Sequence, residues 1–302
     1  MTGSPLDDRL RSRVGPDPGE VDRLAGRLRA LRTGGTDQGP GPGPVPTPDG
    51  GRRSAEFWWY DELGSTNDRL RELAAAGAPD GTVVLAGRQT AGRGRHGRTW
   101  HSPAGGLYLS LLLRPDLDPA RGGWVTLAAA LAVVRRVGSL GAEARIKWPN
   151  DVLCGDRKLA GILAEAALEG GRIAQLVVGI GVNLSWEGEV PAGLRDRAVA
   201  LSELVSAPFD VDRLTAGLLV ESLDLVAGLS SGTGIRGDGS PEFAGEAEER
   251  LYRRGRPVTL RVGVEVATGV CAGLGPEGHL RLEDGRSLAA GELIVWDPEG
   301  GA

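Results

Sequence analysis

Residues 82–113 read TVVLAGRQTAGRGRHGRTWHSPAGGLYLSLLL, and this stretch decides the fold of the chain. Its first part, Thr82–Arg88, and its last part, Leu107–Leu113, are apolar runs of strand length. The intervening segment, Gln89–Gly106, is rich in arginine and glycine. We therefore predict two buried strands joined by a cationic loop.

The loop has the composition of an anion-binding segment. Its glycines let the backbone approach a ligand closely, and its arginines offer forked donors to carboxylate or phosphate oxygens. The glycines are Gly92, Gly94 and Gly97, and the arginines are Arg93, Arg95 and Arg98. GxxxxGK[ST] is absent and the glycines do not lie between a strand and a helix, which excludes a P-loop and a dinucleotide fingerprint. A flexible loop or an RNA-binding arginine patch stays an alternative.

Further elements are predicted on both sides of the loop. Upstream, Phe57–Trp59 is a strand, and the next helix begins after a Ser65 cap and ends at Gly77. Downstream we predict helices over Trp124–Val137 and Asp210–Leu229, strands over Arg145–Trp148, Lys158–Ala166 and Ile173–Ile180, and several short strands from Arg253 onward. Tight turns between the three middle strands, one of them Pro149–Asp151, indicate antiparallel pairing.

The composition indicates a soluble globular protein. The chain has 302 residues, of which 40% are hydrophobic and 25% charged, enough for one large domain and a small one. Its longest nearly apolar stretch, Val125–Val134, is too short to span a bilayer, and no export signal is visible, so we expect a cytoplasmic protein. Cys154 and Cys271 form no CxxC pattern, which argues against a disulfide framework or a thiolate metal site. A net charge of −5 argues against a surface that binds nucleic acid throughout.

Two residue types are scarce, and their positions coincide. The only lysines are Lys147 and Lys158, and the only asparagines are Asn67, Asn150 and Asn183. Each lies in one of four polar or glycine-containing segments, GSTND (64–68), KWPND (147–151), KLAGIL (158–163) and VVGIGVNL (177–184). Ordinary structural roles are available: a helix cap, a proline turn, a lysine that snorkels from a strand end, and glycines that mark a bulge or a close approach. The coincidence of all five scarce residues favours a functional site.

In this order, the four segments and the loop GRQTAGRGRHGRTW resemble the catalytic domain of biotin protein ligases, in the form without an N-terminal DNA-binding domain. The resemblance implies an α/β (α+β) fold, with a mixed, largely antiparallel sheet and helices, similar to class II aminoacyl-tRNA synthetases. A small C-terminal SH3-like β-barrel would follow. We expect a disordered or weakly structured extension with a Gly/Pro linker over 1–54, the catalytic domain over 55–235 and the barrel over 250–298.

The resemblance also implies roles for the residues that match its motifs. Lys158 and Arg95 would be catalytic. Biotin would contact Ser65, Thr66, Asn67, Gln89, Arg93, Gly94, Arg95 and Lys158. The nucleotide would contact Lys147, Trp148, Asn150, Asp151, Gly161 and Asn183, although Lys147, Asn150, Asp151 and Asn183 could instead hold Mg²⁺ or support Lys158. No metal ligand is assigned.

The implied reaction activates biotin with ATP and Mg²⁺ and transfers it to a lysine of the biotin carboxyl carrier protein of acetyl-CoA carboxylase. It needs no serine or cysteine nucleophile, in agreement with the absence of a GxSxG elbow. Neither nucleic acid nor membrane is an expected partner: one helix candidate, Glu20–Arg32, precedes the linker, whereas a helix-turn-helix needs two. The alternatives are a lipoate-type ligase on the same scaffold and a nucleic-acid-binding module that uses the arginine loop.

Overall fold

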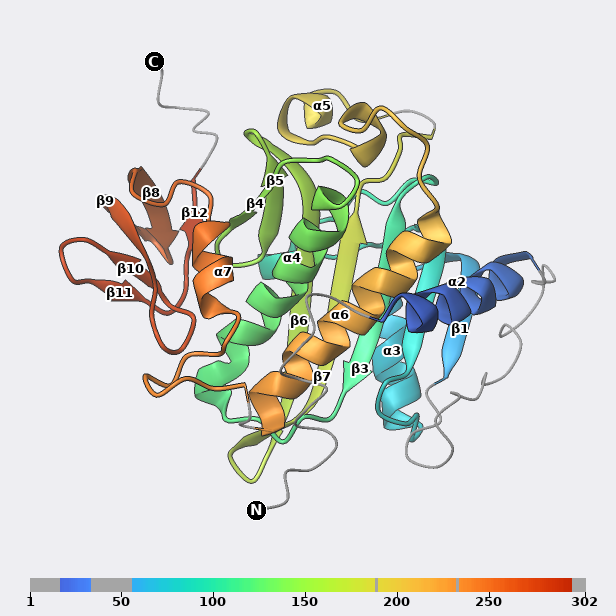
Figure 1. Cartoon of the computed structure of the whole chain (residues 1–302), viewed down its shortest axis with the longest axis horizontal. Helices are drawn as coiled ribbons and strands as arrows, with labels where there is room; N and C mark the ends of the chain where they lie inside the picture. The colour runs from blue at the N-terminus through green and yellow to red at the C-terminus, as the bar shows by residue number, and fades with distance from the viewer. Residues whose placement is uncertain (1–16, 34–55, 188–189, 232–233, 295–302) are drawn as a thin grey trace.

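A seven-stranded sheet forms the centre of the molecule (Figure 1), in a computed structural model that describes residues 17–33, 56–187, 190–231 and 234–294. The strand order is β1-β2-β3-β7-β6-β5-β4. The strands are β1 Phe57–Leu63, β2 Val83–Gln89, β3 Leu107–Leu113, β4 Ala144–Lys147, β5 Asp151–Cys154, β6 Arg157–Glu169 and β7 Arg172–Val182. β1 and β2 are parallel and every other pair is antiparallel. The predicted mixed, largely antiparallel sheet is confirmed.

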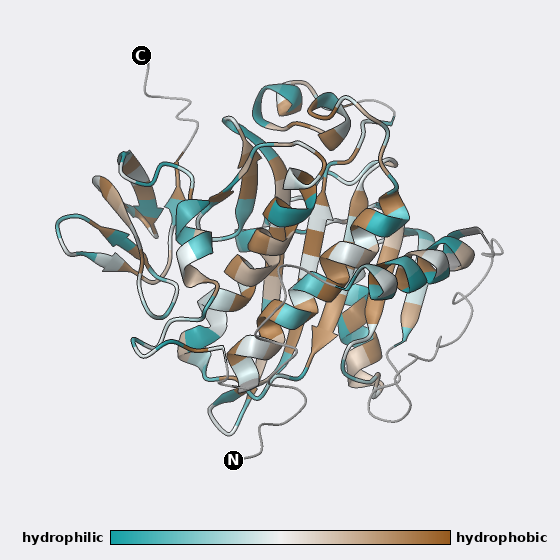
Figure 2. Cartoon of the chain, in the orientation of Figure 1, coloured by the Kyte–Doolittle hydropathy of each residue, from teal (hydrophilic) through white to brown (hydrophobic). Residues whose placement is uncertain are grey.

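Helices cover both faces of this sheet. They are α2 Pro18–Thr33, α3 Thr66–Ala75, α4 Gly122–Gly138, α5 Leu194–Arg197, α6 Val211–Ser231 and α7 Ala244–Glu249. Helices α4, α6 and α2 lie over the face that Figure 1 shows in front. Side chains alternate along a strand, so Val83 and Leu85 pack in the large core on that side while Val84 packs with α3 on the other. Figure 2 shows that hydrophobic residues are concentrated on the strands at the centre of the sheet.

Most predicted elements are confirmed to within a few residues, and β5, α5 and α7 were missed. The structure places β3 at the predicted Leu107–Leu113 and starts α3 after the Ser65 cap. However, Asp151 does not belong to a turn: it begins β5, and the turn-forming residues Pro149 and Asn150 directly before it conceal the start of this strand. The helices α5 and α7, of four and six residues, were missed because one or two helical turns carry too little periodicity.

Helix α2 confirms the helix predicted over Glu20–Arg32 and packs on the large domain. Helix α2 buries Val21, Ala25 and Leu28 in the main core, chiefly against α6. Two arginines of α2, Arg29 and Arg32, pair with Asp212 of α6 at 3.2 and 2.9 Å. The apolar stripe of the helix is therefore stabilised by a neighbour almost 200 residues away in the chain. The predicted linker lies outside the described residues.

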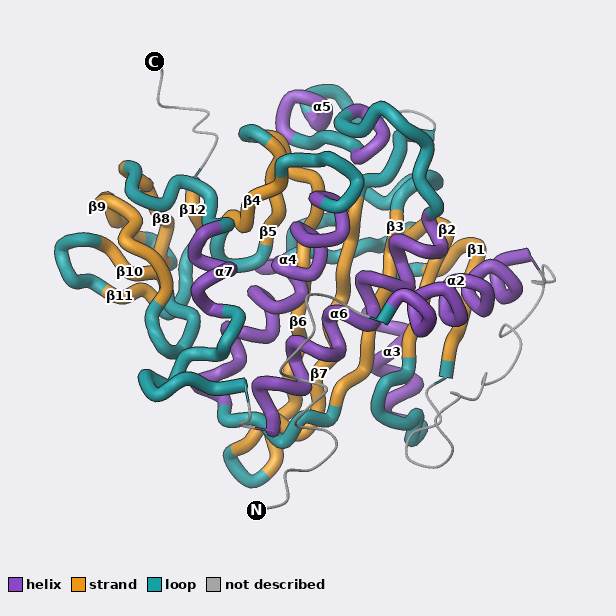
Figure 3. Tube along the Cα trace, in the orientation of Figure 1, coloured by secondary structure: helices purple, strands orange, loops and turns teal. Residues whose placement is uncertain are grey.

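A second sheet follows at the C-terminal end and lies beside α7 (Figure 3). Its strands are β8 Pro257–Val262, β9 Glu265–Leu274, β10 Leu280–Leu282, β11 Ser287–Leu288 and β12 Glu292–Leu293, in the order β11-β10-β9-β8-β12. In the part of the chain that the structure describes, this second small sheet is consistent with the small C-terminal SH3-like domain that was expected. Residues 295–298 of the predicted barrel are outside that part.

Two tryptophans of the large domain form hydrogen bonds to the segment between β9 and β10 of the C-terminal sheet. Trp124 Nε1 donates to the carbonyl of Pro276 at 2.6 Å, and Trp148 Nε1 donates to that of Gly278 at 3.0 Å. Both indoles are buried and fully hydrogen-bonded, so this contact excludes water. No helix in the four described ranges is long and apolar enough to cross a membrane.

Candidate active site

A cavity opens on the α3 face of the large sheet, next to the cap and first turn of α3. Its wall contains nearly every residue that the sequence singled out. These are Ser65, Thr66, Asn67, Gln89, Arg93, Gly94, Arg95, Lys147, Trp148, Asn150, Asp151, Lys158 and Gly161. The four motif segments and the arginine loop, spread over more than a hundred residues of sequence, therefore meet at one place.

A connected set of hydrogen bonds forms the floor of the cavity. The backbone N–H and the hydroxyl of Thr66 both donate to Gln89 Oε1, at 2.8 and 3.1 Å. Ser110 Oγ, from β3, lies 2.8 Å from Thr66 Oγ1 and 2.6 Å from Asn67 Oδ1. Ser65 caps α3 by accepting from the backbone N–H of Asp68. The capping role and the site role of GSTND therefore hold together.

The glycines of β6 and β7 leave room for side chains that line the cavity. A Cβ atom on Gly181 would lie 2.6 Å from Trp100 Nε1, and one on Gly161 would lie 3.0 Å from the same indole. A Cβ atom on Gly179 would lie 2.1 Å from Asn67 Oδ1. The strand pairing continues through these positions without a register shift. Of the two roles expected for these glycines, the structure shows close approach, and the approaching groups are Trp100 and Asn67.

The two lysines share one carboxylate. Lys158 Nζ lies 2.6 Å from Asp151 Oδ1, and Lys147 Nζ lies 3.2 Å from Asp151 Oδ2. The Lys158 ammonium also lies 5.0 Å from the centroid of the Trp100 ring, within cation–π range. Lys147 is buried, whereas the Lys158 side chain is about a quarter exposed to the cavity. Lys158 is therefore the lysine that an incoming anion can reach.

Carboxylates from distant elements neutralise most of the arginine loop. The loop itself contains no carboxylate, but Arg93 lies 2.8 Å from Asp68 and 3.0 Å from Glu165, and Arg98 pairs with Glu292 of the C-terminal sheet. Burial alone would lower the pKa of Arg93, but its bonds to Glu165 and the charges of Glu165 and Asp68 raise it overall. These arginines hold the loop in place.

Arg95 differs from the other loop arginines. Its guanidinium forms no ion pair in the described residues and bonds only to neutral oxygens, Asn150 Oδ1 at 3.3 Å and the carbonyl of Gly291 at 3.4 Å. Desolvation by burial lowers the pKa of Arg95 despite the charges of Asp151 and Glu292. A partly buried guanidinium without its own counterion is a strong site for a ligand anion.

Glu292 ties the C-terminal sheet to the loop, and we expect Glu292→Gln to weaken this tie. Its bond to Arg98 lowers the pKa of Glu292, so the ion pair is present at neutral pH and is lost only as the pH falls through that lowered value. The variant should show faster amide hydrogen exchange over residues 93–99 at pH 7, with little change in the unfolding temperature, since Arg98 is half-exposed. Unchanged exchange at pH 7 would contradict the role of this pair.

Asn183 is the one predicted site residue that does not line the cavity. It is buried, and its Nδ2 donates to the carbonyls of Lys158 and Val199 at 3.1 and 3.3 Å. The geometry favours the alternative role, support of the backbone that carries Lys158. Conversely, Ser110, Trp100, Glu165 and Glu292 belong to the site or its immediate frame and were not assigned to it from the sequence.

The cavity offers no open protein site for Mg²⁺. Both oxygens of Asp151 face lysine ammonium groups, and Glu292 faces Arg98. Among the described residues no cluster of three metal-ligating side chains occurs. The residues present do not fit a resident metal, so an ion that enters would be held mainly by nucleotide phosphates and water.

The cavity has a polar floor around Thr66 and Gln89, and its wall also contains the cations Arg95 and Lys158. This arrangement suits an enzyme that joins a small organic acid to a nucleotide. Similarity to known proteins makes this class of enzyme more specific. A model of the biotin/lipoate A/B protein ligase family matches residues 60–183. A biotin–[acetyl-CoA-carboxylase] ligase of Mycobacterium tuberculosis is 36% identical over 244 residues, which cover 77% of this chain and 86% of that protein. The chain therefore belongs to the biotin/lipoate A/B protein ligase family.

Two further relatives define the extent of the similarity. A biotin protein ligase from Aquifex aeolicus, solved in complex with biotin and ATP, superposes with a TM-score of 0.67 at 31% identity, over 79% of this chain and 97% of that one. The bifunctional ligase/repressor BirA of Bacillus subtilis is 42% identical over 155 residues, which cover 50% of this chain. That match spans about half the length of the Bacillus protein, 48%.

Proposed function

We propose that this chain is an ATP-dependent biotin ligase. In the first step the biotin carboxylate attacks the α-phosphorus of ATP, giving biotinyl-5′-AMP and pyrophosphate. In the second, a lysine amine of a biotin carboxyl carrier protein attacks the acyl-phosphate anhydride, giving the amide and AMP. The observation that carries the proposal is that Arg95 and Lys158 line the same cavity as the Thr66–Gln89 floor.

The residues of the cavity suit the first step electrostatically. Two anions must meet, and the pentacoordinate phosphorus gathers further negative charge, so fixed cations lower the barrier more than they stabilise the separate substrates. In our proposal Lys158 binds the carboxylate and the attacked phosphate, and Arg95 binds the phosphate oxygens. Asp151 orients Lys158, and Lys147 offsets the charge of Asp151. No step depends on a metal bound by the protein.

The proposal also accounts for the second step. The adenylate is labile to water, and a loop held over it by Arg93 and Arg98 would exclude water until the acceptor lysine arrives. The carrier protein as acceptor, Mg²⁺ as companion of ATP and a cytoplasmic location are parts of the proposal. That the chain does not bind DNA stays a prediction, because many residues before β1 lie outside the described ranges.

Biotin-dependent exchange of labelled pyrophosphate into ATP tests the proposal. We expect exchange that requires the purified protein, ATP and biotin, followed by transfer of biotin to a carrier domain on addition of that domain. Exchange with lipoate but not with biotin would support the lipoate-type alternative instead. Exchange with neither acid would refute acid activation altogether.

A further inference from the structure

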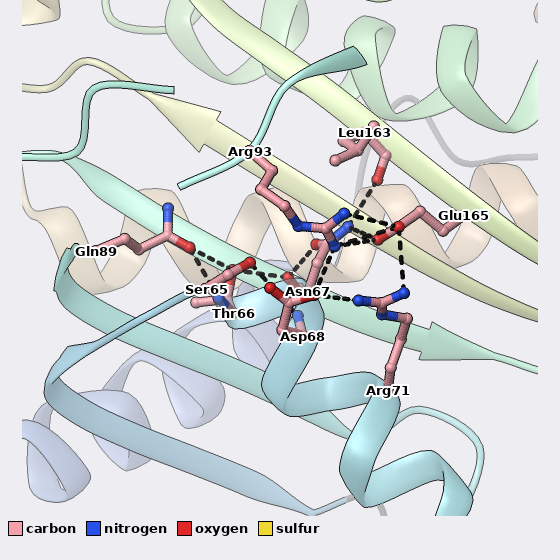
Figure 4. Close-up of polar contacts among 10 residues, drawn as sticks. Ser65, Thr66, Asn67, Asp68, Arg71, Gln89, Arg93, Leu163 and Glu165 are labelled. Carbon is pink, nitrogen blue, oxygen red and sulfur yellow. Dashed lines mark hydrogen bonds and ion pairs between the residues drawn. The ribbon is translucent and has the colours of Figure 1, made fainter. Parts of the chain in front are cut away.

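Glu165 of β6 lies at the junction of the arginine loop and the floor of the cavity, as Figure 4 shows. It accepts a hydrogen bond from Asn67 Nδ2 at 2.8 Å. It also accepts from both terminal nitrogens of Arg93, at 3.0 and 3.2 Å. One carboxylate therefore joins a side chain of α3 to a side chain of the loop.

On the α3 side, Glu165 fixes which way the Asn67 amide points. One amide hydrogen of Asn67 goes to Glu165 and the other to the carbonyl of Leu163, at 3.3 Å, which leaves Oδ1 facing Ser110 at 2.6 Å. Asn67 is 4% exposed, and Gly179 leaves its amide no spare space. A reversed amide would place Asn67 Oδ1 opposite the Glu165 carboxylate and the Leu163 carbonyl, both of which are acceptors. The observed orientation is therefore the one that gives each of these groups a hydrogen-bond partner.

The orientation of Asn67 determines what the floor offers to a ligand. The Ser110 hydroxyl has one hydrogen and two acceptors in range, Asn67 Oδ1 and Thr66 Oγ1. Ser110 is fully buried and does not line the cavity, whereas its neighbours Thr66 and Asn67 do, so it acts on a ligand only through them. A ureido head group presents two N–H donors and one carbonyl acceptor. The hydrogen-bonding side chains of Thr66 and Asn67 in the cavity wall suit a ligand of that class.

On the loop side, Glu165 holds Arg93 together with Asp68. Arg93 Nε is buried without a hydrogen-bond partner in the described chain, so the guanidinium is retained by its terminal nitrogens alone. Removing Glu165 would leave one carboxylate, Asp68, which also pairs with Arg71. The position of the arginine loop therefore depends on Glu165, the same carboxylate that orients Asn67 in the floor of the cavity.

We propose that Glu165 is a positioning residue for biotin, which couples the position of the arginine loop to the hydrogen-bond pattern that recognises the ureido head. The inference rests on the proposed function and deepens it. Glu165 touches neither reacting atom in this assignment: it acts through Asn67 and Arg93. It should therefore govern biotin binding more than ATP binding.

Glu165→Gln tests the inference, because glutamine keeps the shape but loses the charge that serves both partners. In the pyrophosphate exchange assay we expect the KM for biotin to rise about tenfold or more, with the KM for ATP nearly unchanged. Amide hydrogen exchange over residues 91–99 in the presence of biotin should become faster. Glu169→Gln, an exposed carboxylate farther along the same strand, is the matched control and should behave as the wild type.

The double variant Arg93→Ala, Glu165→Gln distinguishes coupling from two separate effects. If Glu165 acts through Arg93, the rise in the biotin KM in the double variant is smaller than the product of the two single effects. An unchanged biotin KM in Glu165→Gln, or equal rises for biotin and ATP, would overturn the inference. If Glu165→Gln does not fold, Arg93→Ala alone must raise the biotin KM selectively, and a wild-type value would overturn it. Absence of exchange in the wild type would instead refute the proposed function.

Discussion

Lys158→Ala is expected to lower biotin-dependent pyrophosphate exchange by about 10²- to 10³-fold, the loss that follows removal of one fixed group that stabilises transition-state charge. Lys158 is the ammonium that faces the cavity, between Asp151 at 2.6 Å and the Trp100 ring at 5.0 Å. The rate of adenylate formation in a single turnover should fall by the same factor, since the ion acts on that step. Isotope exchange at saturating biotin and ATP measures it.

The same variant should remain folded. Asp151 keeps the ion pair with Lys147 at 3.2 Å, so no carboxylate is left buried and alone. We expect the unfolding temperature to shift by less than about 5 °C. Arg157→Ala, which removes the exposed cation next to Lys158, is the control and should retain exchange. Near-normal exchange in Lys158→Ala would return this lysine to an ordinary strand-end role.

Gly179→Ala is expected to impair both stability and biotin binding. The added methyl would lie 2.1 Å from Asn67 Oδ1, and Asn67 cannot swing away without giving up its bonds to Glu165 and Leu163. Overpacking of this kind costs about 1–3 kcal/mol in the free energy of unfolding. A displacement of about 1 Å in the floor costs about 10²-fold in catalysis. Thermal unfolding and the biotin KM in the exchange assay measure the two effects.

Gly26→Ala serves as the control for that substitution. Gly26 is exposed on α2, and a Cβ atom there would meet nothing within 4 Å. Alanine in a helix interior is favoured over glycine by about 0.5–1 kcal/mol, so this variant should be at least as stable as the wild type, with unchanged exchange. If Gly179→Ala had the same unfolding temperature and biotin KM as Gly26→Ala, the close approach of Asn67 to Gly179 would not contribute to stability or to biotin binding.

Local patterns in the sequence predicted most of the framework. Alternating or continuous apolar runs located β2, β3, β6 and β7, and a cap followed by a terminating glycine located α3. β5 was missed because the turn-forming residues before it concealed its start. The stability of α2 was missed because it depends on α6, which no local pattern can reveal.

Residue chemistry and motif order likewise predicted most of the candidate site. The scarce lysines and asparagines marked the segments that line the cavity, apart from Asn183, which supports it. Glu165 had a weak signal: it is a carboxylate within the apolar part of β6, in phase with Gly161 and Leu163 at the period of two. Glu292 had none, since its partner Arg98 is almost 200 residues away.

The sequence by itself determined the elements, the family resemblance and the set of side chains capable of binding anions, because these depend on local periodicity and on the chemistry of short segments. Only the tertiary structure decided which arginine of the loop has no carboxylate partner among the described residues. Glu165, Asp68 and Glu292 neutralise Arg93 and Arg98, while Arg95 faces neutral oxygens. The reason is physical: Coulomb interactions depend on distance in space, and folding brings together charges that the sequence keeps far apart.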